Sequence, residues 1–321
     1  MKIGLAGVGH LGKIHLKCLL NTKFQISGFY DPDFNTRTEV EKSFGIKSFE
    51  SLDDLILSSD CVDIVSPTSF HYSIAKKAIQ ARKHVFIEKP LTESIDQAKE
   101  LVVLANYHQV KVQVGHVERY NPAIRSLKGI ELHPGFIEAH RLAMFNPRGT
   151  DVSVVLDLMI HDIDIVLSLI KSEILDVRAN GICIVSNTPD ICNARIEFKD
   201  GTVANLTASR ISMKNMRKIR LFQSDAYISL DFLEKDAQVI RIKDHEENAE
   251  SGAMTITTSK GIKDITIESP EIMKNNAIEE ELNDFYEAVV NNKEVSVNIE
   301  DGFKALQLAQ LIEDKIKIVH G

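Results

Sequence analysis

The sequence is poor in cysteine, contains no long apolar run and has no excess of positive charge. Its four cysteines are scattered along the chain: Cys18, Cys61, Cys183 and Cys192. No two of them have the C-x-x-C spacing of a zinc site or a redox dithiol. We therefore expect neither a zinc cluster nor a disulfide framework, and the composition is typical of a protein of the reducing cytoplasm.

No uninterrupted apolar run approaches the about 20 residues that a membrane-spanning helix needs. The first residues lead directly into a glycine-rich turn without the apolar core of a secretion signal. We expect no membrane partner and no export. The 321 residues carry a formal net charge of −8, whereas nucleic-acid-binding proteins are typically basic, so a DNA or RNA partner is not expected either.

The pattern of apolar residues divides the chain into two parts. From residue 2 to about 120, short runs of strand length alternate with longer segments of helical periodicity. This alternation predicts βαβ units, and hence a doubly wound parallel sheet in a domain formed by residues 1–120. The length, beyond the about 100 to 200 residues of one domain, agrees with a second domain over residues 121–321.

The second part begins with a predicted helix around residues 152–170. Alternation of period two follows, with Asp200-Gly201 as a hairpin turn, and predicts a mostly antiparallel sheet in an α+β domain. The polar stretch 245–260 reads as an excursion from this sheet. Helices at about 277–291 and 301–318 end the chain, and the last is a candidate for packing back on the first domain.

A G-x-G-x-x-G motif follows the first predicted strand. Gly7 permits a tight turn, Gly9 allows a pyrophosphate to approach the backbone, and Gly12 allows close packing of helix on strand. Asp31 ends the second strand, where its carboxylate can bind an adenosine ribose and repel a 2′-phosphate. This favours NAD over NADP, although Arg37 nearby leaves NADP open. The alternative is a glycine turn in another α/β protein, with Asp31 a turn residue.

A second candidate site is Glu88-Lys89-Pro90, directly after a predicted parallel strand. Open α/β sheets bind ligands at this end of their strands. Lys89 could there lower the pKa of a substrate hydroxyl or share its proton. A strand end closed by a proline turn is the structural alternative.

Asp157, His161 and Asp164 share one face of the predicted helix that opens the second part, because their spacing is i, i+4 and i+7. A carboxylate one turn from an imidazole can orient it as a general base. A solvated polar stripe and a zinc or iron site are the alternatives. We expect no metal, since a nicotinamide cofactor would already supply the electrophile.

In order and spacing, these motifs resemble the glucose–fructose oxidoreductase/inositol dehydrogenase/MocA family over essentially the whole chain. The resemblance also includes Val62-Asp63-Ile64-Val65 before Pro67-Thr68 and His71. It implies an NAD-binding Rossmann domain and a cytoplasmic homo-oligomer, a dimer or tetramer paired through the second-domain sheet. The cofactor-binding residues that it implies are Gly7, Gly9, His10, Leu11, Gly12, Asp31, Pro67, Thr68, His71, Glu88 and Lys89.

The family resemblance also implies catalytic roles for three residues. His161 takes the proton of a sugar hydroxyl, Lys89 assists electrostatically, and Asp157 positions them. Pro90 matches a proline that is usually cis. The family often has glycine where Met159 stands, a departure that concerns the shape of the pocket.

Residues 115–123 and 159–164 look most like the branch that oxidises the 3-hydroxyl of UDP-linked N-acetylated sugars. Arginines are candidates for holding the diphosphate, because a protein of negative charge must concentrate cations locally; these are Arg119, Arg141 and Arg148. Substrate-binding candidates are Arg119, Tyr120, Asn121, Arg148, Asp157 and His161. A dehydrogenase of free sugars or inositols, an NAD-dependent glycosidase and a non-catalytic NAD(H)-binding sensor remain alternatives.

Overall fold

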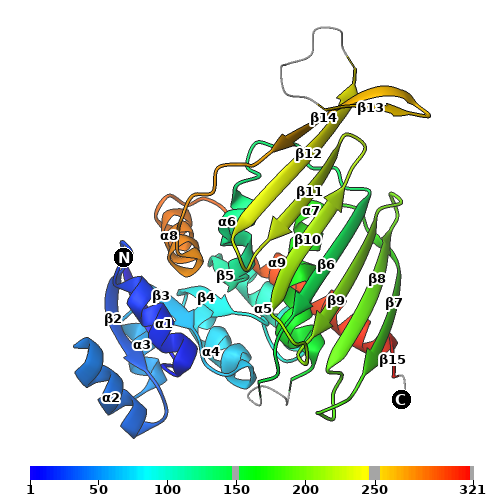
Figure 1. Cartoon of the computed structure of the whole chain (residues 1–321). Coiled ribbons are helices and arrows are strands. Elements are labelled where there is room, and N and C mark those ends of the chain that lie inside the picture. Colours follow the sequence, from blue (N-terminus) through cyan, green and yellow to red (C-terminus); the bar gives the residue numbers. More distant parts are fainter. Residues whose placement is uncertain (147–151, 246–253, 319–321) are drawn as a thin grey trace. The chain divides into compact units, whose positions relative to one another are not determined.

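The computed structural model describes residues 1–146, 152–245 and 254–318 (Figure 1). Contacts divide the chain into two compact units, which we describe separately. The first comprises residues 1–120 and 275–307, and the second comprises residues 121–274 and those from 308 on. Residues 275–307 therefore belong to the first unit, although in sequence they are contiguous with the predicted second domain.

The first unit contains a five-stranded parallel sheet in the order β2-β1-β3-β4-β5. Its strands are β1 (Lys2–Ala6), β2 (Gln25–Tyr30), β3 (Cys61–Ile64), β4 (His84–Glu88) and β5 (Val112–Gly115). Strand β3 is buried at every position, as expected of a strand covered on both faces. The parallel α/β prediction is confirmed. The chain reverses its direction of winding between β1 and β3, the point where such sheets bind ligands.

Helices connect these strands or follow the last of them, and several begin with a side-chain cap. They are α1 (His10–Leu19), α2 (Phe34–Phe44), α3 (Leu52–Leu57), α4 (Thr68–Gln80), α5 (Ile95–His108), the 3₁₀ turn η1 (Val117–Tyr120) and α8 (Ala277–Val290), followed by α9 (Ile299–Lys315), which continues into the second unit. Asp33, Ser51 and Ser94 each accept a backbone N–H in the first turn of their helix. Such caps satisfy donors that the helix itself leaves unbonded.

Helix α8 belongs to the first unit because its apolar side chains complete that unit's core. Leu282 and Phe285 are fully buried against a cluster that includes Ile3, Leu19 and Phe24. Phe285 also meets the rings of Phe24 and Phe86. The amphipathic period predicts that α8 has an apolar face, but it does not identify the surface that covers this face.

The second unit is built on a ten-stranded sheet in the order β13-β14-β12-β11-β10-β6-β9-β8-β7-β15 (Figure 1). Its strands are β6 (Phe136–Leu142), β7 (Ile174–Ile182), β8 (Ile191–Phe198), β9 (Val203–Ser209), β10 (Met216–Phe222), β11 (Ala226–Asp231), β12 (Asp236–Asp244), β13 (Met254–Thr258), β14 (Gly261–Glu268) and β15 (Ile316–Ile318). Only the pairs β6–β9 and β7–β15 are parallel among the described strands. The prediction of a mostly antiparallel sheet is confirmed.

Helix α7 (Ile160–Leu169) contacts β6 and β9 of this sheet, and a π-helical turn (Val155–Met159) precedes it. The short helix α6 (Pro122–Arg125) opens the unit. Two local expectations change. Residues 254–258 of the expected excursion pair with β14, and residues 316–318 form a strand beside β7 instead of ending the last helix. Both result from pairing with a distant strand, which outweighs local periodicity.

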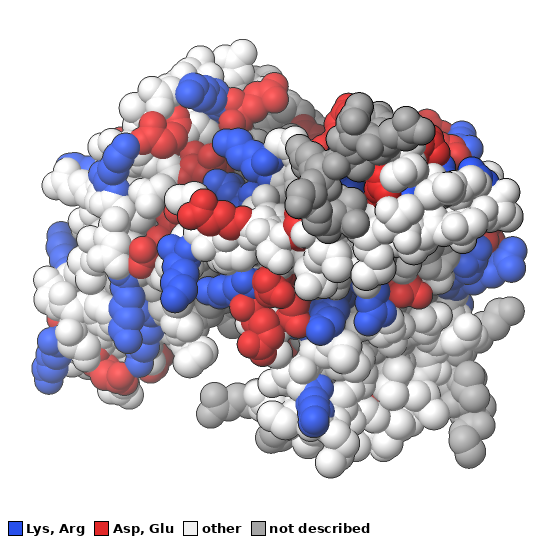
Figure 2. Space-filling view, turned by 45° about the horizontal axis from the view of Figure 1, so that its top comes forward, with Lys and Arg blue, Asp and Glu red and all other residues white. Residues whose placement is uncertain are grey.

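Lysine and arginine side chains are interspersed with aspartate and glutamate on the face shown in Figure 2. Within the described ranges, no helix combines the length and the apolar character needed to cross a bilayer.

Candidate functional site

The glycine loop after β1 contains two glycines that the chain itself requires. Gly7 has φ +97°, and a β carbon there would lie 2.7 Å from the backbone nitrogen of Ser66. A β carbon on Gly12 would lie 2.1 Å from the carbonyl oxygen of Gly7. A side chain at either position would therefore break the contact between loop, helix and strand.

Gly9 differs from Gly7 and Gly12 in the space around its α carbon. No heavy atom lies within 4 Å of the position that its β carbon would occupy. The missing side chain therefore leaves space that the protein does not fill, directly before the first residue of α1. Free backbone N–H groups at a helix start and an open approach to them suit a pyrophosphate. The residues present thus fit a dinucleotide.

Asp31 is held beside this loop at the end of β2. Its Oδ2 accepts the N–H of Val8 at 3.0 Å, and its Oδ1 accepts the N–H of Asp33 at 3.0 Å. Each carboxylate oxygen retains a further lone pair with which to accept a hydrogen bond from a ribose hydroxyl. Arg37 Nη1 donates to the carbonyl of Asp31 at 2.6 Å, and the guanidinium lies over the ring of Phe34. Arg37, the residue that left NADP open, thus has a structural role here.

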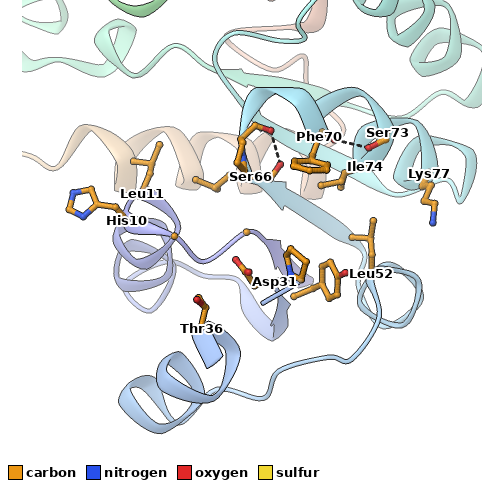
Figure 3. A pocket seen from close by; sticks show the side chains of 16 residues that line it. His10, Leu11, Asp31, Thr36, Leu52, Ser66, Phe70, Ser73, Ile74 and Lys77 are labelled. Carbon is orange, nitrogen blue, oxygen red and sulfur yellow. Dashed lines mark hydrogen bonds between the residues drawn. The ribbon is translucent and has the colours of Figure 1, made fainter. Parts of the chain in front are cut away.

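A cavity of about 720 Å³ opens between the ends of β1, β2 and β3 and the start of α4 (Figure 3). Its lining residues are Gly7, Gly9, His10, Leu11, Tyr30, Asp31, Pro32, Thr36, Leu52, Val65, Ser66, Pro67, Phe70, Ser73, Ile74 and Lys77. Six of the predicted cofactor residues are among them. Leu52, Phe70 and Ile74 were not predicted. They come from two helices of ordinary pattern, and only the fold gathers them around the cavity.

Three other predicted cofactor residues lie around this cavity without lining it. Gly12 packs against the loop, and Thr68 begins α4. His71 is buried, with its ring nitrogens 2.9 Å from the carbonyl oxygens of Ser66 and Pro90. Burial lowers the pKa of His71, and its ring lies between the loops that follow β3 and β4.

The E-K-P motif lies where the sequence places it, at the carboxyl end of β4. Glu88 is buried, and its Oε2 accepts the backbone N–H of Lys89 at 3.1 Å. Lys89 is half-buried, and its bond to Pro90 is cis. Burial by itself would raise the pKa of Glu88, but the hydrogen bond and charge of His15 hold it below its ordinary value. Glu88 is therefore an anion close to the backbone of Lys89.

In the second unit, Asp157 lies in the π-helical turn and His161 in the first turn of α7. Both side chains are half-buried, whereas Asp164 is only 1% exposed. The expected common face assumed 3.6 residues per turn throughout, and the wider π turn alters that register at Asp157. Such turns are frequent at functional sites, and the sequence carries no clear signal for this one.

Two predicted substrate residues have structural contacts. Tyr120 is 1% exposed, and its hydroxyl donates to Asp284 at 2.7 Å within the first unit. Asn121 caps α6 by accepting the N–H of Ala123, and it donates to the carbonyl of Phe232. These contacts position the chain where the two units join in sequence.

The three arginines proposed for a diphosphate differ in surroundings. Arg141 is 3% exposed and forms a two-pronged ion pair with Asp162, at distances of 2.8 to 3.1 Å. It therefore serves the core of the second unit. Arg119, on η1, is half-buried. Arg148 lies outside the described residues.

The glycine loop, Asp31 and the cavity define the first unit as a dinucleotide-binding domain. A family model described as the oxidoreductase family with an NAD-binding Rossmann fold matches residues 1–116, and the GFO/IDH/MocA C-terminal domain matches residues 133–229. The chain belongs to the glucose–fructose oxidoreductase/inositol dehydrogenase/MocA family. It is an NAD-dependent dehydrogenase that acts on CH–OH groups.

Individual relatives agree with this assignment. The UDP-N-acetylglucosamine 3-dehydrogenase of Acidithiobacillus ferrooxidans is 36% identical over 296 residues, which cover 92% of this chain and 90% of the relative. A solved structure of an enzyme of that name and organism superposes with a TM-score of 0.89 at 33% identity, over 98% of this chain and 97% of the other. A scyllo-inositol dehydrogenase from Lactobacillus casei, solved with NAD(H) and scyllo-inositol, has a TM-score of 0.75 at 22% identity over 98% and 96%, a likeness of fold alone.

Proposed function

We propose that this enzyme oxidises the 3-hydroxyl of a UDP-linked N-acetyl sugar to a ketone. The observation that carries the proposal is the 36% identity to a UDP-N-acetylglucosamine 3-dehydrogenase over 92% of this chain. The E-K-P motif lies at the end of β4 in the first unit. The D-x-x-x-H motif lies in the second unit, with Asp157 in the π-helical turn and His161 in the first turn of α7.

His161 is the proposed general base that takes the hydroxyl proton, and Asp157 orients its ring. The Lys89 ammonium stabilises the alkoxide charge that develops as the hydride leaves. When bound, NAD supplies the hydride acceptor. Arg119 is the described arginine proposed to contact the diphosphate, since Arg141 is committed to Asp162.

A substrate panel tests the proposed reaction. UDP-N-acetylglucosamine, UDP-glucose, free sugars and inositols are incubated with enzyme and NAD, and absorbance of the reduced cofactor is recorded. We expect the fastest turnover with the UDP-N-acetyl sugar. Turnover of inositol or a free sugar alone would replace the substrate assignment and keep the dehydrogenase. Tight NAD binding without any turnover would support the sensor alternative.

Substitutions test the residue roles. His161→Ala removes the base, so kcat is expected to fall by about 10² to 10⁴ while NAD affinity changes little. Lys89→Ala is expected to behave similarly, because it removes the cation that stabilises the same charge. Asp176→Ala is the control, since this carboxylate pairs with Arg178 on the surface of β7. Near-normal kcat in both active-site variants would overturn the assigned roles.

We also propose that the reaction needs no metal, because Lys89 and His161 handle the proton. Turnover after treatment with EDTA is expected to equal that of untreated enzyme. A loss that zinc restores would instead make Asp157, His161 and Asp164 ligand candidates.

Finally, we propose that the protein is a cytoplasmic homo-oligomer whose second-unit sheet forms the contact. All four cysteines are free thiols, which suits a reducing compartment. Phe136, Phe222 and Tyr227 form an aromatic group on that sheet, and Phe222 is 37% exposed. Light scattering coupled to size exclusion tests this. A monomer at micromolar concentration would contradict the proposal, and Phe222→Arg is expected to weaken the assembly.

A further inference from the structure

Four titratable side chains from four elements of the first unit lie together near the end of β4. They are His15 on α1, Asp63 on β3, Glu88 on β4 and Glu281 on α8, and none is more than 8% exposed. We call them the acid cluster. None lines the cavity at the glycine loop, and the mechanism above uses neither His15, Asp63 nor Glu281.

The imidazole of His15 lies between two carboxylates. Its Nδ1 is 3.0 Å from Oδ2 of Asp63 in a hydrogen bond, and its Nε2 is 3.1 Å from Oε1 of Glu88 in a close ion pair. A neutral imidazole carries only one N–H and would direct a lone pair at one of these anions. An imidazolium instead places its positive charge beside both anions, with a hydrogen bond from Nδ1 to Asp63 and an ion pair of Nε2 with Glu88 that lacks hydrogen-bond geometry. The close approach of two carboxylates therefore favours the charged ring.

The charges around the ring support this protonation state. Burial alone would lower the pKa of His15, but Asp63 and Glu88 together raise it well above its usual value. Glu281 also faces the cluster, and burial together with the charge of Glu88 raises its pKa well above normal. Cys18, on the same helix, is a further titratable neighbour, and burial raises its pKa. Lys89 interacts electrostatically with Glu88, and Tyr120 with Glu281. Burial also raises the pKa of Asp63, although the charge and hydrogen bond of His15 oppose this rise. Asp63 and Glu88 thus face the ring of His15, and Glu281 lies beside them.

The Glu88 carboxylate is confined from two further directions. Its Oε2 accepts the backbone N–H of Lys89 at 3.1 Å. Across the sheet, Gly115 pairs with Glu88, and a β carbon on Gly115 would lie 2.7 Å from Oε1. The carboxylate therefore occupies a slot that only glycine leaves open. A shift of this carboxylate would move the backbone at Lys89.

We propose that His15 is a positioning residue: by binding Asp63 and Glu88 at once, it fixes the Glu88 carboxylate and thereby sets the position of Lys89. This inference rests on the proposed catalytic role of Lys89. His15 does not touch the substrate. It acts from one side of the E-K-P turn, and His71 holds the carbonyl of Pro90 at the other.

Imidazole NMR tests the protonation state independently of any reaction. The full-length protein is labelled with ¹⁵N-histidine, with and without NAD, and His15 is identified by the signals lost in His15→Gln. We expect both ring nitrogens to be protonated at about pH 7.5, above the ordinary histidine pKa of about 6.5. A neutral tautomer at about pH 7.5 would overturn the proposal.

Single-turnover kinetics test the positioning. NAD-saturated enzyme is mixed with UDP-N-acetylglucosamine, or with whichever panel substrate the wild type oxidises. In His15→Gln the hydride-transfer rate is expected to fall by about 10- to 100-fold, the size of effect that misplacement of a catalytic group produces. The dissociation constant of NAD is expected to change less than about twofold, since the cavity is untouched.

Two further variants keep this test decisive. Gly115→Ala displaces the Glu88 carboxylate without removing a polar group, and it is expected to slow hydride transfer likewise even if His15→Gln fails to fold. Leu19→Ala, one turn along α1, is the control because it removes only apolar contacts. Equal rates in the control and in the folded test variants would overturn the proposal. Near-normal turnover of Lys89→Ala would instead overturn the proposed catalytic role of Lys89, and the NMR result would still stand.

Discussion

The two units treat buried charge differently. In the second unit, Arg141 and Asp162 are each 3% exposed and match one cation to one anion through two-pronged geometry. In the first unit, the acid cluster sets three acidic side chains against the single base His15. In a matched pair the two charges compensate each other, whereas in an unmatched cluster protons and charge are distributed among several groups.

This difference in charge balance indicates which buried charges are structural and which lie near a functional site. The Arg141–Asp162 pair joins β6 to α7 through two-pronged, charge-assisted hydrogen bonds, which suits a core. The acid cluster lies beside the E-K-P turn, and perturbed titratable groups of this kind concentrate at functional sites. Charge balance therefore distinguishes a structural ion pair from a positioning device within one chain.

Breaking the matched pair is expected to have the largest effect. Asp162→Ala leaves a buried guanidinium without its carboxylate, so the free energy of unfolding should fall by about 3 to 5 kcal/mol. Denaturant unfolding monitored by far-UV circular dichroism measures this. The double variant Arg141→Met/Asp162→Leu is expected to recover most of the loss, because it removes both charges together. A single variant as stable as the wild type would show that the pair contributes little to stability.

Asp31 is a carboxylate of a third kind, because its proposed partner is a ligand instead of another side chain. Asp31→Ala removes the acceptor for the ribose hydroxyls, and NAD binding is expected to weaken by about 1 to 3 kcal/mol. The preference for NAD over NADP should narrow, because repulsion of the 2′-phosphate disappears. Fluorescence titration with NADH and NADPH measures both. Equal affinities of the wild type for the two cofactors would contradict the role of Asp31.

The acid cluster should make stability depend on pH. The pKa values of His15 and Glu281 are raised in the folded protein, which therefore binds more protons than the unfolded chain. Their contributions fall as pH rises above the unfolded values, about 4.3 for Glu281 and about 6.5 for His15. Glu281→Gln should flatten this decline by at most about 1.4 kcal/mol per pH unit. Denaturant unfolding at several pH values tests it, and parallel curves for wild type and variant would refute it.

An exposed ion pair is expected to matter least. Nζ of Lys199 lies 2.5 Å from Oε2 of Glu173, but the two side chains are 58% and 78% exposed. Water and salt screen such a pair, so Lys199→Ala should unfold at the same denaturant concentration as the wild type. A clear loss of stability would show that distance alone, rather than burial and balance, governs the ion pairs of this protein.

Much of the cofactor site was predictable because local motifs define it. The G-x-G-x-x-G loop and Asp31 require only short-range geometry, and the structure places Gly7, Gly9 and Asp31 around one cavity. The E-K-P turn at the end of β4 follows equally from local pattern. The apolar lining by Leu52, Phe70 and Ile74 was not predictable, because these residues come from two helices, α3 and α4, and have no motif of their own.

By itself, the sequence determined the two sheet types, the glycine loop and the chemical character of the candidate site, since strand period, turn residues and motif spacing act over a few residues. Tertiary structure alone decided that α8 completes the first unit's core and brings Glu281 to the acid cluster, that residues 316–318 pair with β7, and that Arg141 belongs to a buried ion pair. These outcomes depend on contacts between residues far apart in sequence. Their energies come from burial and charge pairing, which no local pattern encodes.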